Sequence, residues 1–175
     1  MTDTRIIVVL CSLFVLSLMA AEFLRPEPID RSWVSTYLTG PDSWIEDVGF
    51  LLLAAAVFLM PAVLPGPRWL YMVSGISIVM VMASRVLLPR ITSFPPDIVT
   101  RVHVAFSGIA FLSTGVLAFL ALGRPALLVL GIMGLACALA LVFAPPAIRM
   151  QIAEKLLTLG IPLAFIVPLV QRLRG

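Results

Sequence analysis

Residues 126–143, ALLVLGIMGLACALALVF, form the stretch that decides the fold, because none of these eighteen residues carries a charge. An α-helix rises ~1.5 Å per residue, so a run of this length covers most of the ~30 Å hydrocarbon core of a bilayer. Helix-breaking residues flank it, with Gly123 and Pro125 before it and Pro145 after it. The segment is therefore predicted to be a transmembrane helix.

Five other stretches share this pattern, at roughly 6–23, 47–64, 69–88, 102–122 and 152–170. Proline or glycine residues mark most of the connections between them. The first stretch is longer than the apolar part of a usual signal peptide and five more spans follow it, so we expect it to be retained. The sequence predicts an all-α polytopic membrane protein: one domain, residues 1–175, built as an antiparallel bundle of six transmembrane helices.

The composition supports this class and excludes others. Hydrophobic residues make up 61% of the chain and charged residues 12%, whereas soluble domains are about half apolar and a quarter charged. The net charge of +3 is dispersed, and no basic run with interleaved aromatics indicates nucleic-acid binding. Two cysteines and one histidine are too few for a metal site built from these residues. We expect no metal, no cofactor and no nucleic-acid partner.

The connections between the predicted helices alternate between short and long. Six helices that alternate in direction place both termini on the side of the two short connections, 65–68 and 123–125. That side carries five basic residues and one acid, and the other side carries seven bases and eight acids. The count of bases alone favours the long-loop side as cytoplasmic. Because those bases are interspersed with acids, we instead predict cytoplasmic termini.

The first long connection has a structure of its own in this interpretation. Residues 31–38 place Trp33 and Tyr37 at helical spacing, which predicts a short interfacial helix at headgroup depth. Ser43 and Glu46 then have the spacing of a capping box, in which each side chain bonds the backbone of the other residue. This pair is predicted to open the second transmembrane helix.

Ionisable residues cluster at those helix ends that face the long connections. Because neighbouring helices run in opposite directions, these ends lie at one depth. Together with two polar residues of the first long connection they form a candidate ligand-binding set. We call this set the polar rim, and its members are Glu22, Ser35, Tyr37, Asp47, Arg85, Asp97, Arg101, His103, Glu154 and Lys155.

Much of the polar rim is explained by the helix dipole, which favours acids in a first turn and bases in a last turn. Three residues are predicted at the helix end that disfavours their charge, and they need an opposite charge nearby to offset this: Glu22, Arg101 and Lys155. Asp97 and Arg101 have i, i+4 spacing and can pair on their own helix. Glu22 is expected to pair with Lys155, Arg85 or Arg101 across the bundle. Two interpretations of the polar rim therefore stay open, a structural network of ion pairs and a site for a substrate or ion.

His103 is the only histidine, and it belongs to a stripe of small and hydroxyl residues. That stripe is Thr100, His103, Ser107, Gly108, Thr114 and Gly115. The preceding helix has a similar stripe of Ser74, Ser77, Ser84 and Arg85. Residues 126–143 have a third one, of Gly131, Gly134 and Ala138. Such stripes usually mark helix–helix contacts. The alternative is a polar crevice between the third and fourth helices, with His103 at its mouth as a proton acceptor.

Several short segments also form an ordered set: STYLTG at 35–40, GF at 49–50, FPPD at 94–97 followed by His103, and IAEKL at 152–156. In this order they resemble the family called domain of unknown function 998, small multi-pass membrane proteins of bacteria and archaea. The resemblance covers nearly the whole chain and implies a prokaryotic cytoplasmic membrane, but no activity. The polar positions that it implies are Ser35, Asp97, His103, Glu154 and Lys155. The chain departs from the family at Gln151, where glycine is usual, and at Lys155, where arginine is usual.

Three functions follow as hypotheses. The first is a binding or transport module that receives a lipid-like or quinone-like amphiphile from the bilayer at the polar rim. The second is an accessory structural subunit of a larger, energy-transducing membrane complex, or a homo-oligomer, docked through the small-residue stripes. The third is an intramembrane hydrolase that uses Ser35 or Ser107 with His103 and Asp97, although the chain has no GxSxG motif to support it.

Overall fold

The computed structural model describes residues 2–24, 43–88, 94–145 and 148–174. Its elements, in chain order, are α1 (Thr2–Leu24), α2 (Ser43–Leu59), the 3₁₀ turn η2 (Met60–Ala62), α3 (Arg68–Val86), α5 (Pro96–Leu122), α6 (Arg124–Phe143) and α7 (Arg149–Arg174). Six of these helices are long and apolar enough to cross a membrane, and the described part of the chain contains no strand. The prediction of an all-helical chain with six candidate spans is confirmed.

Proline and glycine set several of the helix boundaries. The second helix begins at Ser43, where the capping box predicts its start, but its α-helical part ends earlier than predicted, at Leu59. Pro61 explains this early end, because proline has no backbone N–H to continue the ladder and the chain tightens into η2. Gly123 alone joins α5 to α6, with a φ of 64° that favours glycine.

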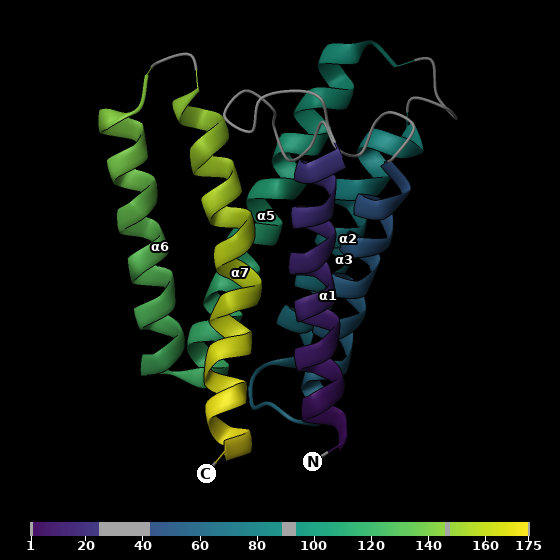
Figure 1. Cartoon of the computed structure of the whole chain (residues 1–175). Helices are drawn as coiled ribbons and strands as arrows, with labels where there is room; N and C mark the ends of the chain where they lie inside the picture. Colours follow the sequence, from purple (N-terminus) through teal and green to yellow (C-terminus); the bar gives the residue numbers. More distant parts are fainter. Residues whose placement is uncertain (1, 25–42, 89–93, 146–147, 175) are drawn as a thin grey trace.

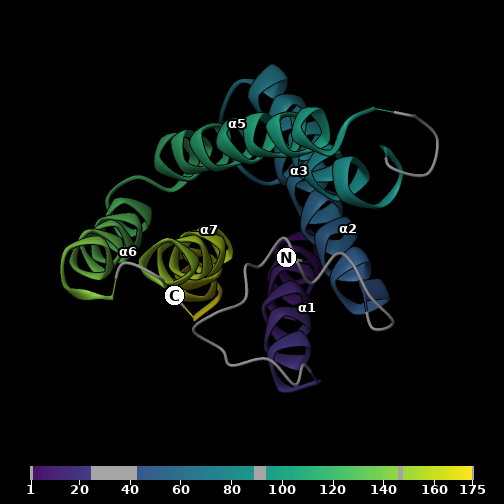
Figure 2. The same ribbon diagram turned by 90° about the horizontal axis from the view of Figure 1, so that it is seen from above.

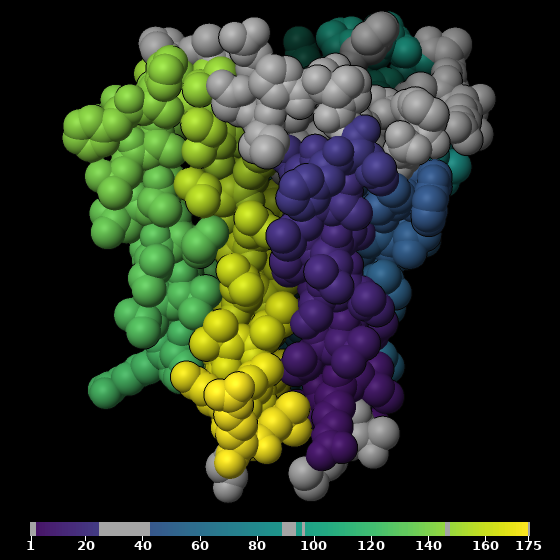
Figure 3. Space-filling view, viewed as in Figure 1, coloured from purple at the N-terminus to yellow at the C-terminus, as the bar shows by residue number. Residues whose placement is uncertain are grey.

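Five of the helices form a closed ring, and α6 lies outside it. Around the ring α1 contacts α2, α2 contacts α3, α3 contacts α5, α5 contacts α7, and α7 returns to α1. The sixth helix, α6, packs mainly on α7 and touches α5 much less, and Figure 2 shows it at the edge of the bundle. In Figure 3, α1 and α7 lie side by side, with α6 beyond α7.

Both termini lie at the same end of the bundle, together with the connection 63–67 and the junction of α5 with α6 (Figure 1). The C-terminal ends of α1 and α3 and the N-terminal ends of α2, α5 and α7 lie at the opposite end. Those ends carry the described members of the polar rim. The rim residues therefore share one end of the molecule, as the pattern of spans predicts.

Apolar side chains fill the ring and also cover the outside. Phe14, Tyr71 and Phe165 are fully buried, and the Phe14 and Phe50 rings meet edge to face with centroids 5.3 Å apart. In α6 the buried residues are Ala126 and Cys137, while the rest of this strongly apolar helix is exposed or partly exposed. An apolar outer surface of this extent fits a lipid environment.

The glycines that bring helices together differ from the predicted ones. A Cβ atom would meet nothing within 4 Å at Gly108, Gly115, Gly131 or Gly134. These four glycines therefore make no close helix–helix contact within the described part of the chain. Close approach occurs instead where a Cβ would press on Ser17, Phe58 or Met133, at Gly49, Gly75 and Gly160 respectively. Docking of a partner on the open faces stays a prediction.

Candidate functional site

An ion pair joins the first and last helices at the polar rim. The Nζ atom of Lys155 on α7 lies 2.7 Å from Oε1 of Glu22 on α1, and the two side chains are 14% and 20% exposed. Of the three partners predicted for Glu22, Lys155 is the one that the structure selects. Glu22 lies in the last turn of α1, where the helix dipole disfavours an acid, and the ion pair offsets this. Lys155 lies beyond the first turn of α7, because that helix begins at Arg149, earlier than the predicted 152.

His103 on α5 is buried, at 4% exposure, against α3. Its Nδ1 atom lies 3.0 Å from Oγ of Ser84 and 3.2 Å from the carbonyl oxygen of Val81. The Ser84 hydroxyl donates to the same Val81 carbonyl at 2.8 Å. Polar groups of the two helices thus meet here in direct contact, as the helix–helix interpretation of the stripe predicts, and the alternative of a crevice between these two helices does not hold at His103.

These contacts determine which ring nitrogen of His103 carries the proton. A carbonyl oxygen accepts hydrogen bonds and cannot donate, and the single Ser84 proton is already given to Val81. Nδ1 must therefore be the protonated nitrogen of the neutral imidazole. Nε2 then carries a lone pair and acts as a hydrogen-bond acceptor.

A cavity of about 590 Å³, which we call the lateral groove, lies among α3, α5, α6 and α7. Its polar lining comes from the rim end of these helices, and the remainder is mostly apolar. The lining residues are Arg85, Thr100, His103, Val104, Ser107, Gly108, Phe111, Cys137, Leu141, Met150, Ala153, Glu154 and Leu157. The Nε atom of Arg85 is buried there without a hydrogen-bond partner among the described residues. The groove thus joins one basic side chain, Arg85, and one acidic side chain, Glu154, to an apolar channel.

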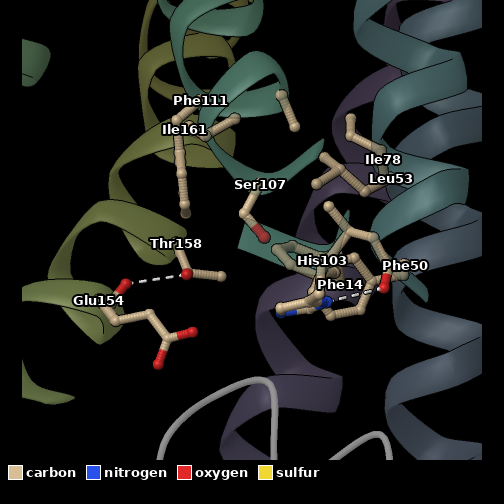
Figure 4. A pocket seen from close by; sticks show the side chains of 12 residues that line it. Phe14, Phe50, Leu53, Ile78, His103, Ser107, Phe111, Glu154, Thr158 and Ile161 are labelled. Carbon is tan, nitrogen blue, oxygen red and sulfur yellow. Dashed lines mark hydrogen bonds between the residues drawn. The ribbon is translucent and has the colours of Figure 1, made fainter. Parts of the chain in front are cut away.

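A second, smaller space lies at the centre of the ring. This central cavity has a volume of about 40 Å³ and shares His103, Ser107, Phe111 and Glu154 with the lateral groove. Figure 4 shows Glu154 and Thr158 of α7 on one side of it and His103 and Ser107 of α5 on the other. His103 consequently forms part of the wall between the two spaces.

The other predicted site residues lie away from both cavities. Asp47 is partly buried near the start of α2 and lines neither space. Asp97 and Arg101 are exposed, and no ion pair joins them in the described part of the chain, so their predicted pairing is wrong. The first turns of α5 project past the neighbouring helices (Figure 1), and an exposed pair gains little energy there. Ser35, Tyr37 and the interfacial helix at 31–38 fall outside the described residues.

The catalytic arrangement proposed for a hydrolase does not form from Ser107, His103 and Asp97. In a triad the carboxylate holds the Nδ1–H of the histidine. Here that N–H faces Val81 and Ser84, while Asp97 is exposed on the first turn of the same helix as His103. Ser35, the other predicted nucleophile, lies outside the described residues.

Two features of the interior escape the sequence interpretation. Glu46, taken there only as a capping residue, is completely buried. Its i+3, i+4 and i+7 neighbours Gly49, Phe50 and Leu53 are also buried, so helical spacing could have placed it on the inner face. Cys137 lines the lateral groove, and its thiol donates to the Ala153 carbonyl oxygen at 3.5 Å, joining α6 to α7.

No metal centre is formed by the described residues, since no three His, Cys, Asp or Glu side chains among them are grouped to hold an ion. Comparison of the chain with protein-family models, with curated proteins and with solved structures gives no match. The resemblance to the domain of unknown function 998 family therefore stays a prediction from the sequence.

Proposed function

We propose that the protein binds a lipid-like amphiphile with an anionic headgroup in the lateral groove, as a binding or transport module of a prokaryotic cytoplasmic membrane. The observation that supports this proposal is the lining of the groove, which is polar at one end, where Arg85 offers a cationic headgroup contact beside Glu154, and apolar along the rest. The six helices then cross the bilayer in alternating directions, with cytoplasmic termini. In that setting the polar end of the groove lies near one membrane surface.

The size of the groove suits such a ligand. Its volume of about 590 Å³ falls within the ~300–1,000 Å³ typical of small-molecule sites. Val104, Phe111, Leu141 and Leu157 supply apolar walls for an acyl chain. Because α6 touches α5 so little, the tail can enter from the side, directly from the surrounding lipid.

Arg85 is the group that selects the headgroup. Its Nε is removed from solvent without a partner among the described residues, which is unfavourable for a polar donor. A phosphate oxygen satisfies such a guanidinium through charge-assisted, often bidentate, hydrogen bonds. An anionic lipid phosphate at the polar end of the groove would therefore relieve an otherwise unfavourable burial.

Replacing Arg85 by alanine is expected to weaken retention of an anionic phospholipid by about tenfold, because one charge-assisted contact is lost. Arg85→Lys should keep part of the affinity for the lipid, since it preserves the charge but not the paired N–H donors of the guanidinium. Native mass spectrometry of protein extracted in a mild detergent measures the bound lipid. Arg101→Ala is the matched control, because Arg101 is an exposed arginine that lines neither cavity. Equal lipid retention in the unaltered protein and in these three variants would refute the proposal.

The apolar part of the groove is tested by filling it. A side chain added at Gly108 meets no atom within 4 Å and projects from the groove wall, so Gly108→Phe should block the tail without strain in the packing. Gly115→Phe is the matched control, since Gly115 is equally open but does not line the groove. We expect lipid loss in Gly108→Phe alone, with similar unfolding midpoints for both variants. Loss in both variants, or in neither, would contradict this location for the tail.

A further inference from the structure

The hydrogen bonds of His103 extend the proposed function to the class of its ligand. We propose that the headgroup carries, besides a phosphate held by Arg85, a hydroxyl group that donates a hydrogen bond to Nε2 of His103. The ligand class is therefore an anionic phospholipid with a hydroxylated headgroup, for which phosphatidylglycerol is the probe. This inference rests on the proposed function, since it concerns the same groove.

The first step is the acceptor character of Nε2. With the Nδ1 proton directed at Val81 and Ser84 on α3, the neutral ring has only a lone pair to offer on its other edge. Figure 4 shows the second ring nitrogen of His103 on the side that faces α7, across the pocket from Glu154 and Thr158. A molecule bound beside this edge must supply a donor, and a bare phosphate oxygen or an ester carbonyl cannot do so.

The second step distinguishes a hydroxyl from an ammonium group. Arg85 directly follows Ser84, whose hydroxyl contacts the His103 ring, so the guanidinium and the imidazole belong to one corner of the groove. A second cation bound at His103 would be repelled by Arg85 but attracted by Glu154, which lines the same groove, so these two charges do not decide the step. A neutral hydroxyl donates the same hydrogen bond without the cost of removing a second cation from water into a mostly apolar groove.

The third step concerns the space available. The central cavity holds about 40 Å³, which admits a water molecule but not a headgroup. The lateral groove is more than ten times larger (about 590 Å³ against about 40 Å³), and it shares His103 with the central cavity. Because His103 and Glu154 line both spaces, a headgroup hydroxyl that bonds Nε2 has to enter between them from the groove.

The test compares two lipids whose headgroups differ in hydroxyl groups but not in charge. Phosphatidylglycerol and phosphatidylethanol carry the same phosphodiester charge, but the first has two headgroup hydroxyls and the second has none. Delipidated protein in detergent is titrated with each, and native mass spectrometry records the fraction bound. We expect phosphatidylglycerol to bind about threefold to tenfold more tightly, the value of one added hydrogen bond.

His103→Phe should abolish this preference and leave the affinity for phosphatidylethanol nearly unchanged. Ser113→Ala is the control on the same helix, because its hydroxyl bonds the Ile109 carbonyl oxygen at 2.6 Å and lines neither cavity. If His103→Phe does not fold, Ser84→Ala provides a second variant, since the ring then loses a contact at Nδ1 and the preference should fall while phosphatidylethanol still binds.

The outcomes separate the two proposals. Binding of both lipids with equal affinity, still dependent on Arg85, would overturn the hydroxyl assignment and leave the proposed function intact. Binding of neither lipid, or binding that ignores Arg85, would overturn the proposed function itself. Preference for phosphatidylethanolamine over phosphatidylglycerol, lost in His103→Phe, would show that the donor is an ammonium group and would also overturn the assignment.

Discussion

Replacing Gly49 by leucine is expected to destabilise the protein by about 3 kcal/mol, at the upper end of the range for overpacked interiors. A Cβ at this position in α2 would collide with Oγ of Ser17 in α1. That hydroxyl cannot easily turn aside, because it donates to the Phe14 carbonyl oxygen at 2.7 Å. The unfolding midpoint of purified protein, measured with increasing denaturing detergent, reports the change.

Gly131→Leu on α6 is the matched control for this experiment. It makes the same chemical change in another apolar helix, so the gain in helix propensity is common to both variants. A Cβ at Gly131 meets no atom within 4 Å, and we expect a change within about 0.5 kcal/mol. The milder Gly49→Ala should be partly rescued by Ser17→Ala, which removes the colliding oxygen. Independent, additive effects of these two changes would mean that α1 and α2 do not meet here.

Replacing Lys155 by methionine should cost about 2 kcal/mol of stability. Loss of one partner from a buried ion pair costs ~3–5 kcal/mol, and exposed pairs contribute ~0–1 kcal/mol. At 14% and 20% exposure, the Lys155 and Glu22 side chains fall between these limits. Methionine keeps most of the side-chain volume, so the lost charge accounts for most of the effect. The same detergent titration measures the unfolding midpoint.

The exchange of the two charges provides the control. Glu22→Lys combined with Lys155→Glu restores the attraction and also places a basic residue in the last turn of α1, which the helix dipole favours. We therefore expect the double variant to be at least as stable as the unaltered protein, and each single reversal to be less stable than Lys155→Met. A double variant no better than the single reversals would show that α1 and α7 are not held together by this pair.

The architecture could be predicted from the sequence because each span is a long apolar run whose ends are marked locally. Pro61, Gly123 and Pro95 act on their own backbone, so their effect on helix boundaries needs no knowledge of neighbours. The clustering of the polar rim followed from alternation of direction alone. The pairing of Glu22 with Lys155 was one of three options, since sequence does not reveal which helix lies beside α1.

The cavities could not be predicted, because they depend on the order of the helices around the ring. For the hydroxyl stripe of α5 the sequence leaves both a helix–helix contact and a crevice against α3 open, and Ser84 and His103 meet in direct contact. The lateral groove arises from the outlying position of α6, which contacts α7 much more than α5. Nothing in the composition of 126–143 distinguishes an outer helix from an inner one, since both must be apolar in a bilayer.

The contact between the first and last helices has a consequence for biogenesis. During synthesis α1 emerges with Glu22 at its end, while Lys155 emerges only after four further spans have been made. The last helix to be made therefore closes the ring, and every nascent chain passes through a stage in which the seam between α1 and α5 is open. A chain that stops before α7 would lack the Lys155 partner of Glu22 and would leave the interior of the ring unsealed.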